Sequence, residues 1–154
     1  MAQVTPVPEG MHTVTPHLTV KGAADYIDFL KRAFGAVELH RSPVPSGKLV
    51  HAAVRIGDSV VMLNDHMPEF GSPPIAEGMW PIALHLYVPD VDAAFAQATA
   101  AGCKVTMPLA DQFWGDRYGQ LEDPFGFRWS IAARKEELTP EQRNDRMKAL
   151  FGGG

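Results

Sequence analysis

Two histidines lie at matching places in a repeated four-residue pattern. His17-Leu18-Thr19-Val20 returns as His85-Leu86-Tyr87-Val88, a spacing of 68 residues (85 minus 17). Imidazole can bind a divalent metal, carry a proton or hydrogen-bond a ligand. Two interpretations are open: a metal held by His17, His85 and Glu122, or histidines of a cavity wall that bind no metal. We favour the second, because the spacing fixes no further ligand. We expect the remaining histidines at the surface: His12, His40, His51 and His66.

A second segment combines aromatic rings, a glycine and a pair of opposite charges. Phe113-Trp114-Gly115-Asp116-Arg117-Tyr118 suits the rim of a pocket, because the rings offer apolar surface and the glycine permits close backbone approach. Arg117 could hold a ligand carboxylate or phosphate with two hydrogen bonds. The alternative is an ion pair between Asp116 and Arg117 at the surface, beside core aromatics. The expected ligand-binding residues are therefore His17, His85, Phe113, Trp114, Asp116, Arg117, Tyr118 and Glu122.

Composition narrows the classes of function. Cys103 is the only cysteine, so no disulfide within the chain and no cysteine-based zinc site can form, and we expect a small buried apolar residue there. The formal net charge is −4 with no cluster of Lys and Arg, which argues against a nucleic-acid partner. Apolar runs are too short to span a bilayer, and the first ten residues lack the features of a signal peptide. We expect a cytoplasmic protein that binds neither membrane nor nucleic acid.

In the first half of the chain, apolar and polar residues first alternate, as in a strand, and the apolar residues then recur at helical spacing. This order predicts a β-α-β-β-β unit. Apolar residues at helical spacing are followed by Gly35, which predicts a helix that ends there. Two prolines and a glycine predict a loop over 42–47. The expected order is a strand over 13–20, a helix over 22–34, and strands over 37–40, 49–56 and 60–64.

The second half repeats this order after a segment rich in Pro and Gly. Its expected elements are a strand over 82–88, a helix over 90–101, a strand over 104–107, a loop over 108–115, and strands over 117–122 and 127–132. The sequence thus predicts an α+β fold of two tandem β-α-β-β-β modules. The expected organisation is a flexible arm over 1–11, modules over 12–66 and 82–134, a linker over 67–81, and a C-terminal helical extension over 135–154.

The C-terminal extension begins with the pattern of a capped helix. Thr139-Pro140-Glu141-Gln142 places a threonine cap, a proline at the first helical position and a glutamine at the third. Such a short helix is not stable alone, so it must pack on the body or on another subunit. We expect a homodimer, and the alternative is docking of a different protein on this helix.

Three stretches resemble a known family. Val88–Phe95 and Asp123–Ile131 are similar to segments of the vicinal oxygen chelate superfamily, which includes glyoxalases, bleomycin-resistance proteins and extradiol dioxygenases. Asp111–Gly119 resembles the PhnB-like subgroup. The resemblance implies tandem modules that form a curved sheet around a cavity for a small molecule.

The resemblance also implies four metal-ligand positions, one on the first and one on the last strand of each module. Here they fall on Thr15, Met62, Ala83 and Ser130, none of which is the expected His or Glu. We therefore expect a small-molecule-binding protein without the usual metal and without a cofactor. The alternatives are a lyase, isomerase or dioxygenase with a divalent metal at His17, His85 and Glu122, and a protein-interaction module that uses the C-terminal helix.

Overall fold

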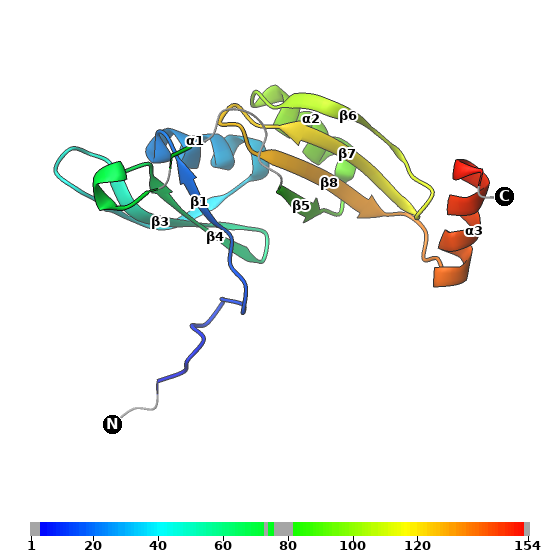
Figure 1. Cartoon of the computed structure of the whole chain (residues 1–154), viewed down its shortest axis with the longest axis horizontal. Helices are drawn as coiled ribbons and strands as arrows, with labels where there is room; N and C mark the ends of the chain where they lie inside the picture. The colour runs from blue at the N-terminus through cyan, green and yellow to red at the C-terminus, as the bar shows by residue number, and fades with distance from the viewer. Residues whose placement is uncertain (1–3, 73, 76–81, 153–154) are drawn as a thin grey trace. The chain divides into compact units, whose positions relative to one another are not determined.

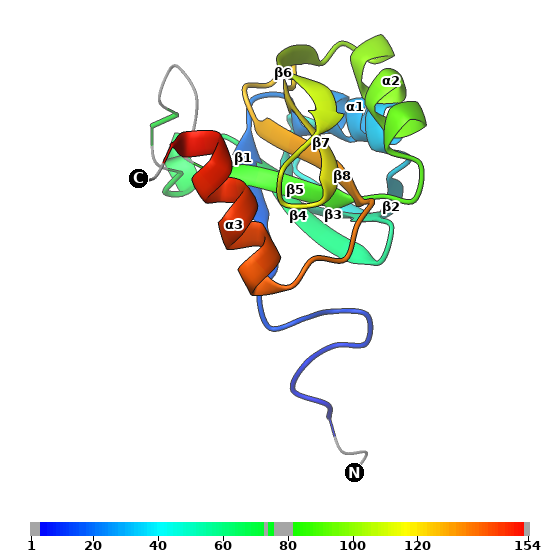
Figure 2. The ribbon, with the colours of Figure 1, turned by 90° about the vertical axis from the view of Figure 1, so that its right-hand side faces the viewer.

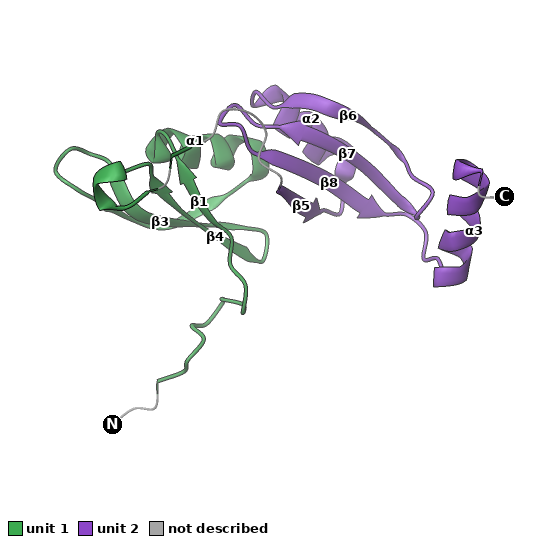
Figure 3. Cartoon of the chain, in the orientation of Figure 1, with its two compact units in different colours: residues 1–77 green, residues 78–154 purple. Residues whose placement is uncertain are grey.

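The computed structural model describes residues 4–72, 74–75 and 82–152. The chain divides into two compact units, residues 1–77 and residues 78–154 (Figure 3). Each unit contains a four-stranded mixed sheet, and the α+β class expected from the sequence is confirmed. Part of the expected linker, residues 73 and 76–81, lies outside the described residues, as do residues 1–3 of the expected arm and 153–154 of the expected extension.

Unit 1 has the strand order β1-β4-β3-β2, with β1 parallel to β4 and the other pairs antiparallel. The helix α1 packs on β1, β3 and β4, and Gly35 ends it in the left-handed conformation (φ 65) as expected. Strand β2 continues into the predicted loop at residues 42 and 43, because its hairpin with β3 extends to that point. The elements are β1 (His17–Val20), α1 (Ala23–Phe34), β2 (Val37–Pro43), β3 (Leu49–Ile56), β4 (Ser59–Asp65) and a short 3-10 helix η1 (Pro68–Phe70).

Unit 2 has the corresponding strand order, β5-β8-β7-β6, with β5 parallel to β8. The loop predicted over 108–115 is wrong in its first half, since β6 runs on to Asp111 and pairs with β7 at Ala110 and Asp111. An irregularity between Met107 and Ala110 accommodates Pro108 in this edge strand. The elements are β5 (Ala83–Tyr87), α2 (Val91–Ala100), β6 (Lys104–Asp111), β7 (Asp116–Glu122), β8 (Arg128–Arg134) and α3 (Pro140–Phe151).

Alternation along the strands gives the unit 2 sheet two different faces. One face packs against α2 and carries Leu121, Trp129 and Ile131, whose exposed fractions are 1% or less (Figure 1). Side chains one residue away along each strand lie on the opposite face. We call this the open face, and it includes His85, Tyr87, Tyr118, Gln120, Glu122 and Ser130.

A buried carboxylate ties the elements of unit 1 together. Asp65, at the end of β4, accepts hydrogen bonds from the backbone N–H groups of Gly22 and Ala23 at the start of α1. It also accepts one from Leu49 N–H at the start of β3, at 2.7 Å. These bonds satisfy donors that a helix start leaves unpaired, so one side chain fixes a helix and two strands.

The C-terminal helix α3 has the capping box that the sequence predicts. Thr139 Oγ1 accepts from Gln142 N–H, and Gln142 Oε1 accepts from Thr139 N–H. Figure 1 shows α3 beyond the strand ends at the β6–β7 turn, and Figure 2 shows it apart from α2. Among the described residues, no helix is long and apolar enough to cross a membrane.

We predict that Gly119→Ala destabilises unit 2 by about 1–3 kcal/mol, because it overpacks the contact between α2 and β7. A Cβ at this position would lie 2.6 Å from Phe95 Cε2 and 3.1 Å from the backbone of Leu109. Urea unfolding measures the loss, and Gly119→Ala combined with Phe95→Leu should recover part of it. An unchanged unfolding free energy in Gly119→Ala would contradict this packing.

Candidate functional site

The open face of unit 2 brings polar and aromatic side chains into adjacent rows. Register places His85 beside Ser130, and Ser130 beside Gln120. Tyr87 and Tyr118 flank Ala132 in the next row. Paired residues on neighbouring strands share a face, so these side chains form one continuous surface.

His85 makes three contacts on this surface. Its Nδ1 lies 2.6 Å from the Oγ of Ser130. Its ring stacks on Tyr118 (centroids 5.8 Å apart, planes at 22°) and meets Tyr87 at 4.6 Å in an edge-on arrangement. Partial burial lowers the pKa of His85, and the charge of Asp116 opposes this shift. The imidazole is therefore held in place and favours its neutral form.

Two further hydrogen bonds orient the tyrosines. The hydroxyl of Tyr87 donates to Asp116 Oδ2 at 3.3 Å, and burial, followed by the Asp116 carboxylate, raises the pKa of Tyr87. Gln120 Nε2 donates to the hydroxyl of Tyr118 at 2.8 Å. Asp116 itself is buried, with 6% of its surface exposed. Both rings are thus fixed by groups of the same face.

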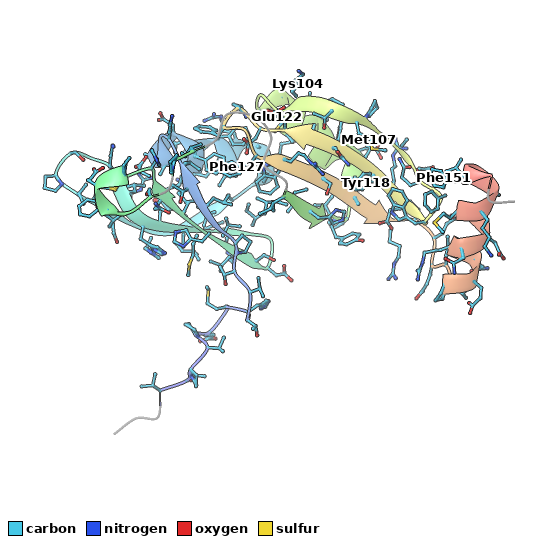
Figure 4. All side chains as sticks on the ribbon, viewed as in Figure 1. Lys104, Met107, Tyr118, Glu122, Phe127 and Phe151 are labelled. Atoms are coloured by element: carbon cyan, nitrogen blue, oxygen red, sulfur yellow. The ribbon has the colours of Figure 1, made fainter. Side chains whose placement is uncertain are left out.

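The aromatic surface continues from Tyr118 to the C-terminal helix. Trp114 lies in the β6–β7 turn, and its ring centroid is 5.3 Å from that of Tyr118 and 5.1 Å from that of Phe113. The ring centroids of Phe113 and Phe151, a residue of α3, are 6.0 Å apart. Figure 4 shows Phe151 on α3 beyond the Tyr118 end of β7. The sequence singled out Phe113, Trp114 and Tyr118 and missed Phe151, because nothing in the helical pattern indicates which strand end α3 approaches.

Arg117 does not lie with the other predicted site residues. It follows Asp116 and precedes Tyr118 in β7, so its side chain is on the face that packs against α2. Its guanidinium contacts Asp92 of α2 at 2.9 Å and Asp111 at 3.2 Å. Neither sequence interpretation of Arg117 describes this placement: it faces away from the open face, and it does not pair with Asp116.

Glu122 is on the open face but far from His85. Its register partners are Lys104 and Arg128, whereas His85 pairs with Ser130. A displacement of two strands and two residues separates the Cα atoms by about 12 Å. Figure 4 shows Glu122 at the end of β7 away from Tyr118. Among the described residues, Glu122 and His85 belong to no group of three His, Cys, Asp or Glu side chains that could hold a metal ion.

Unit 1 gathers three histidines on the face opposite α1. His17 pairs in register with Met62, and its ring lies 5.6 Å from that of His51. His40 Nε2 and His51 Nδ1 are 2.7 Å apart, and the two rings are stacked. Burial, His40 and His17 lower the pKa of His51. From the sequence, His40 and His51 are expected at the surface as separate residues, because only the β2–β3 register shows that they meet.

The strand pairs β1–β4 and β5–β8 do not carry the ligands that a tightly held divalent ion requires. Met62 lies beside His17 and Ser130 lies beside His85, so each strand pair offers one imidazole with a thioether or a hydroxyl. Thr15 precedes β1, and Ala83 lies beside Arg128. Within the described ranges, no three His, Cys, Asp or Glu side chains are arranged to hold a metal. Divalent ions of this kind require several nitrogen or carboxylate ligands.

Comparison with known proteins places the chain in a family. A model of the Glyoxalase/Bleomycin resistance protein/Dioxygenase superfamily matches residues 10–131. An uncharacterized protein of Mycobacterium tuberculosis is 47% identical over 144 residues, which cover 91% of this chain and 85% of that protein. The crystal structure of TioX from Micromonospora sp. ML1 is similar with a TM-score of 0.62 and 27% identity, and the match covers 83% of this chain and all of TioX.

A metal-containing protein shares the fold at lower identity. FosX of Listeria monocytogenes, a fosfomycin resistance protein crystallised with Mn(II) and sulfate, is 17% identical with a TM-score of 0.62, over 88% of this chain and 97% of FosX. The protein described here belongs to the glyoxalase/bleomycin resistance protein/dioxygenase superfamily.

We predict that Cys103 does not react with a thiol reagent such as Ellman's reagent at pH 8 in the native protein. Only 5% of the residue is exposed, and burial, followed by the charge of Asp123, raises the pKa of its thiol to about 12. The reactive thiolate is therefore nearly absent. Unfolding in urea should release one reactive thiol per chain. Rapid stoichiometric reaction of the folded protein would contradict this environment.

Proposed function

We propose that this chain is a small-molecule-binding protein of the superfamily, of the PhnB-like subgroup, and that unit 2 binds the ligand on its open face. The observation that carries the proposal is the arrangement of His85 between Ser130, Tyr87 and Tyr118. Each of these side chains is oriented by another polar or aromatic group of the same face. Such pre-oriented groups lower the entropy that binding costs.

The surface combines two kinds of recognition. The rings of Tyr118, Tyr87 and Trp114 offer apolar area for a planar ligand, and burial of such area is favourable by about 25 cal/mol per Å². His85 and Gln120 offer hydrogen-bonding groups at fixed positions. Binding sites for small molecules commonly pair an apolar wall with a few placed polar groups. Arg117, which the sequence nominated as the anchor of an anion, is not part of this site.

A metal-dependent lyase, isomerase or dioxygenase is the second candidate. The observation that favours it is the matching strand position of His17 and His85, in a fold that holds Mn(II) in FosX. The donor set of each unit argues against it, since Met62 and Ser130 stand beside these histidines. Elemental analysis of protein purified without chelator separates the two. Stoichiometric metal that is lost in the His17→Ala and His85→Ala variants would support the enzyme and overturn the metal-free proposal.

We predict that Tyr118→Ala weakens the binding of ligands found in a small-molecule screen by about tenfold, because it removes an aromatic wall worth roughly 1–2 kcal/mol. Arg117→Ala is the matched control from the neighbouring position, and it should leave ligand affinity unchanged. Ligand-observed NMR and calorimetry provide the affinities. Ligands whose affinity falls in Arg117→Ala and stays unchanged in Tyr118→Ala would contradict this assignment of the open face.

We also propose that the protein is a cytoplasmic homodimer in which α3 contributes to the contact. Leu150 and Phe151 of α3 are 64% and 72% exposed in the single chain. We expect sedimentation at micromolar concentration to show a dimer, and deletion of residues 139–154 to weaken it. A 16.8 kDa species alone would contradict the dimer, and a stable complex with a different protein that depends on α3 would support an interaction module instead.

A further inference from the structure

Ser130 is nearly inaccessible, and its side chain hydrogen-bonds to His85. Only 3% of the residue is exposed. In the part of the chain that the structure describes, the partner of its hydroxyl is Nδ1 of His85, at 2.6 Å. A serine hydroxyl can donate one hydrogen bond and accept others, whereas a neutral imidazole nitrogen does one or the other. The direction of this bond therefore decides where His85 carries its proton.

The two possible directions leave different groups unsatisfied. If Nδ1–H donates to Ser130, the buried hydroxyl proton has no acceptor among the described residues, which is unfavourable. If the Ser130 hydroxyl donates to an unprotonated Nδ1, the donor is satisfied and the imidazole proton is on Nε2. Doubly protonated His85 would give the same unsatisfied hydroxyl, and partial burial disfavours that charge.

We propose that Ser130 is a positioning residue that holds neutral His85 with its proton on Nε2, and that this site takes an uncharged planar ligand with a conjugated carbonyl oxygen. The proposal rests on the proposed function of the open face. Nε2 has no hydrogen-bond partner within the described chain, so its N–H is available to an acceptor atom. The rings of Tyr118 and Tyr87, in contact with the imidazole, provide the surface on which a planar ligand lies.

The surroundings of His85 favour a neutral acceptor over an anion. The charged group that acts on His85 is the carboxylate of Asp116. An anionic oxygen at Nε2 would be repelled by this carboxylate, whereas a carbonyl oxygen carries no net charge. The guanidinium of Arg117 contacts Asp92 and Asp111 on the other side of the sheet. The arginines of the open face, Arg128 and Arg134, each stand beside a carboxylate residue in register, Glu122 and Asp116. The ligand class is thus set by a neutral donor between aromatic rings.

The tautomer is measured first, in the full chain without ligand, by long-range proton–nitrogen correlation NMR of the imidazole rings. We expect His85 to show a single Nε2–H tautomer, a mixture in Ser130→Ala, and a single tautomer again in Ser130→Thr, which retains the hydroxyl. His17 is the internal control, because its register partner Met62 has no hydroxyl and its signals should not change. An Nδ1–H tautomer in the wild type, or a single Nε2–H tautomer in Ser130→Ala, would overturn the positioning role.

The ligand class is tested with three probes of one skeleton: indanone, indane and indane carboxylate. Indanone should bind about tenfold more tightly than indane, the ratio expected for one hydrogen bond, and also more tightly than the carboxylate. His85→Ala should abolish the difference between indanone and indane, and Ser130→Ala should weaken indanone about two- to threefold as the competent tautomer becomes less populated.

Two outcomes overturn the ligand class and are separable from each other. If indane or the carboxylate binds as tightly as indanone, the class is wrong although the open face binds ligands. If no probe and no screening hit shifts the signals of open-face residues while His85 keeps its Nε2–H tautomer, the proposed function fails and the ligand class fails with it.

Discussion

Each unit of this protein packs one helix against one face of a four-stranded sheet, and this constraint determines where chemistry can occur. Side chains alternate between the faces, so the residues that build the core and those left for binding are interleaved along every strand. In β8, Trp129 and Ile131 are buried under α2, and Ser130 between them is on the open face. For each candidate residue on a strand, the odd or even position along that strand decides which face of the sheet the side chain occupies.

The alternation of side chains between the two faces also explains why neighbours in the sequence have different roles. Asp116 and Tyr118 belong to the network around His85, whereas Arg117 bonds to α2. Gly119 is the next residue on the α2 side, and the close approach of Phe95 requires the absence of a side chain there. Strand β7 thus carries packing residues on one side and the proposed recognition residues on the other.

Much of the fold could be predicted from the sequence because it depends on local signals. Changes in the spacing of apolar residues located both sheet-packed helices and most strands. Gly35 indicated the end of a helix, and Thr139 indicated the start of another. The continuation of β6 past Pro108 could not be predicted in this way, because pairing with β7 outweighs the local preference for a loop.

The site was predictable only in part. The repeat pointed to His85, and the aromatic segment pointed to Tyr118 and Trp114. The roles of Ser130 and Gln120 depend on which residues of β5, β7 and β8 stand side by side, and register is a property of the paired strands. The meeting of His40 with His51 likewise depends on a hairpin register that includes an irregularity between Glu38 and His40.

The central claim is that ligands bind to the open face of unit 2. The most direct measurement is the mapping of NMR chemical-shift changes on the wild-type protein as a screening hit is added. We predict that the largest changes occur at His85, Tyr118 and Gln120, with small changes at Asp92 and Arg117 on the other face. Changes centred on α2, or on the histidines of unit 1 with none at His85 and Tyr118, would contradict it.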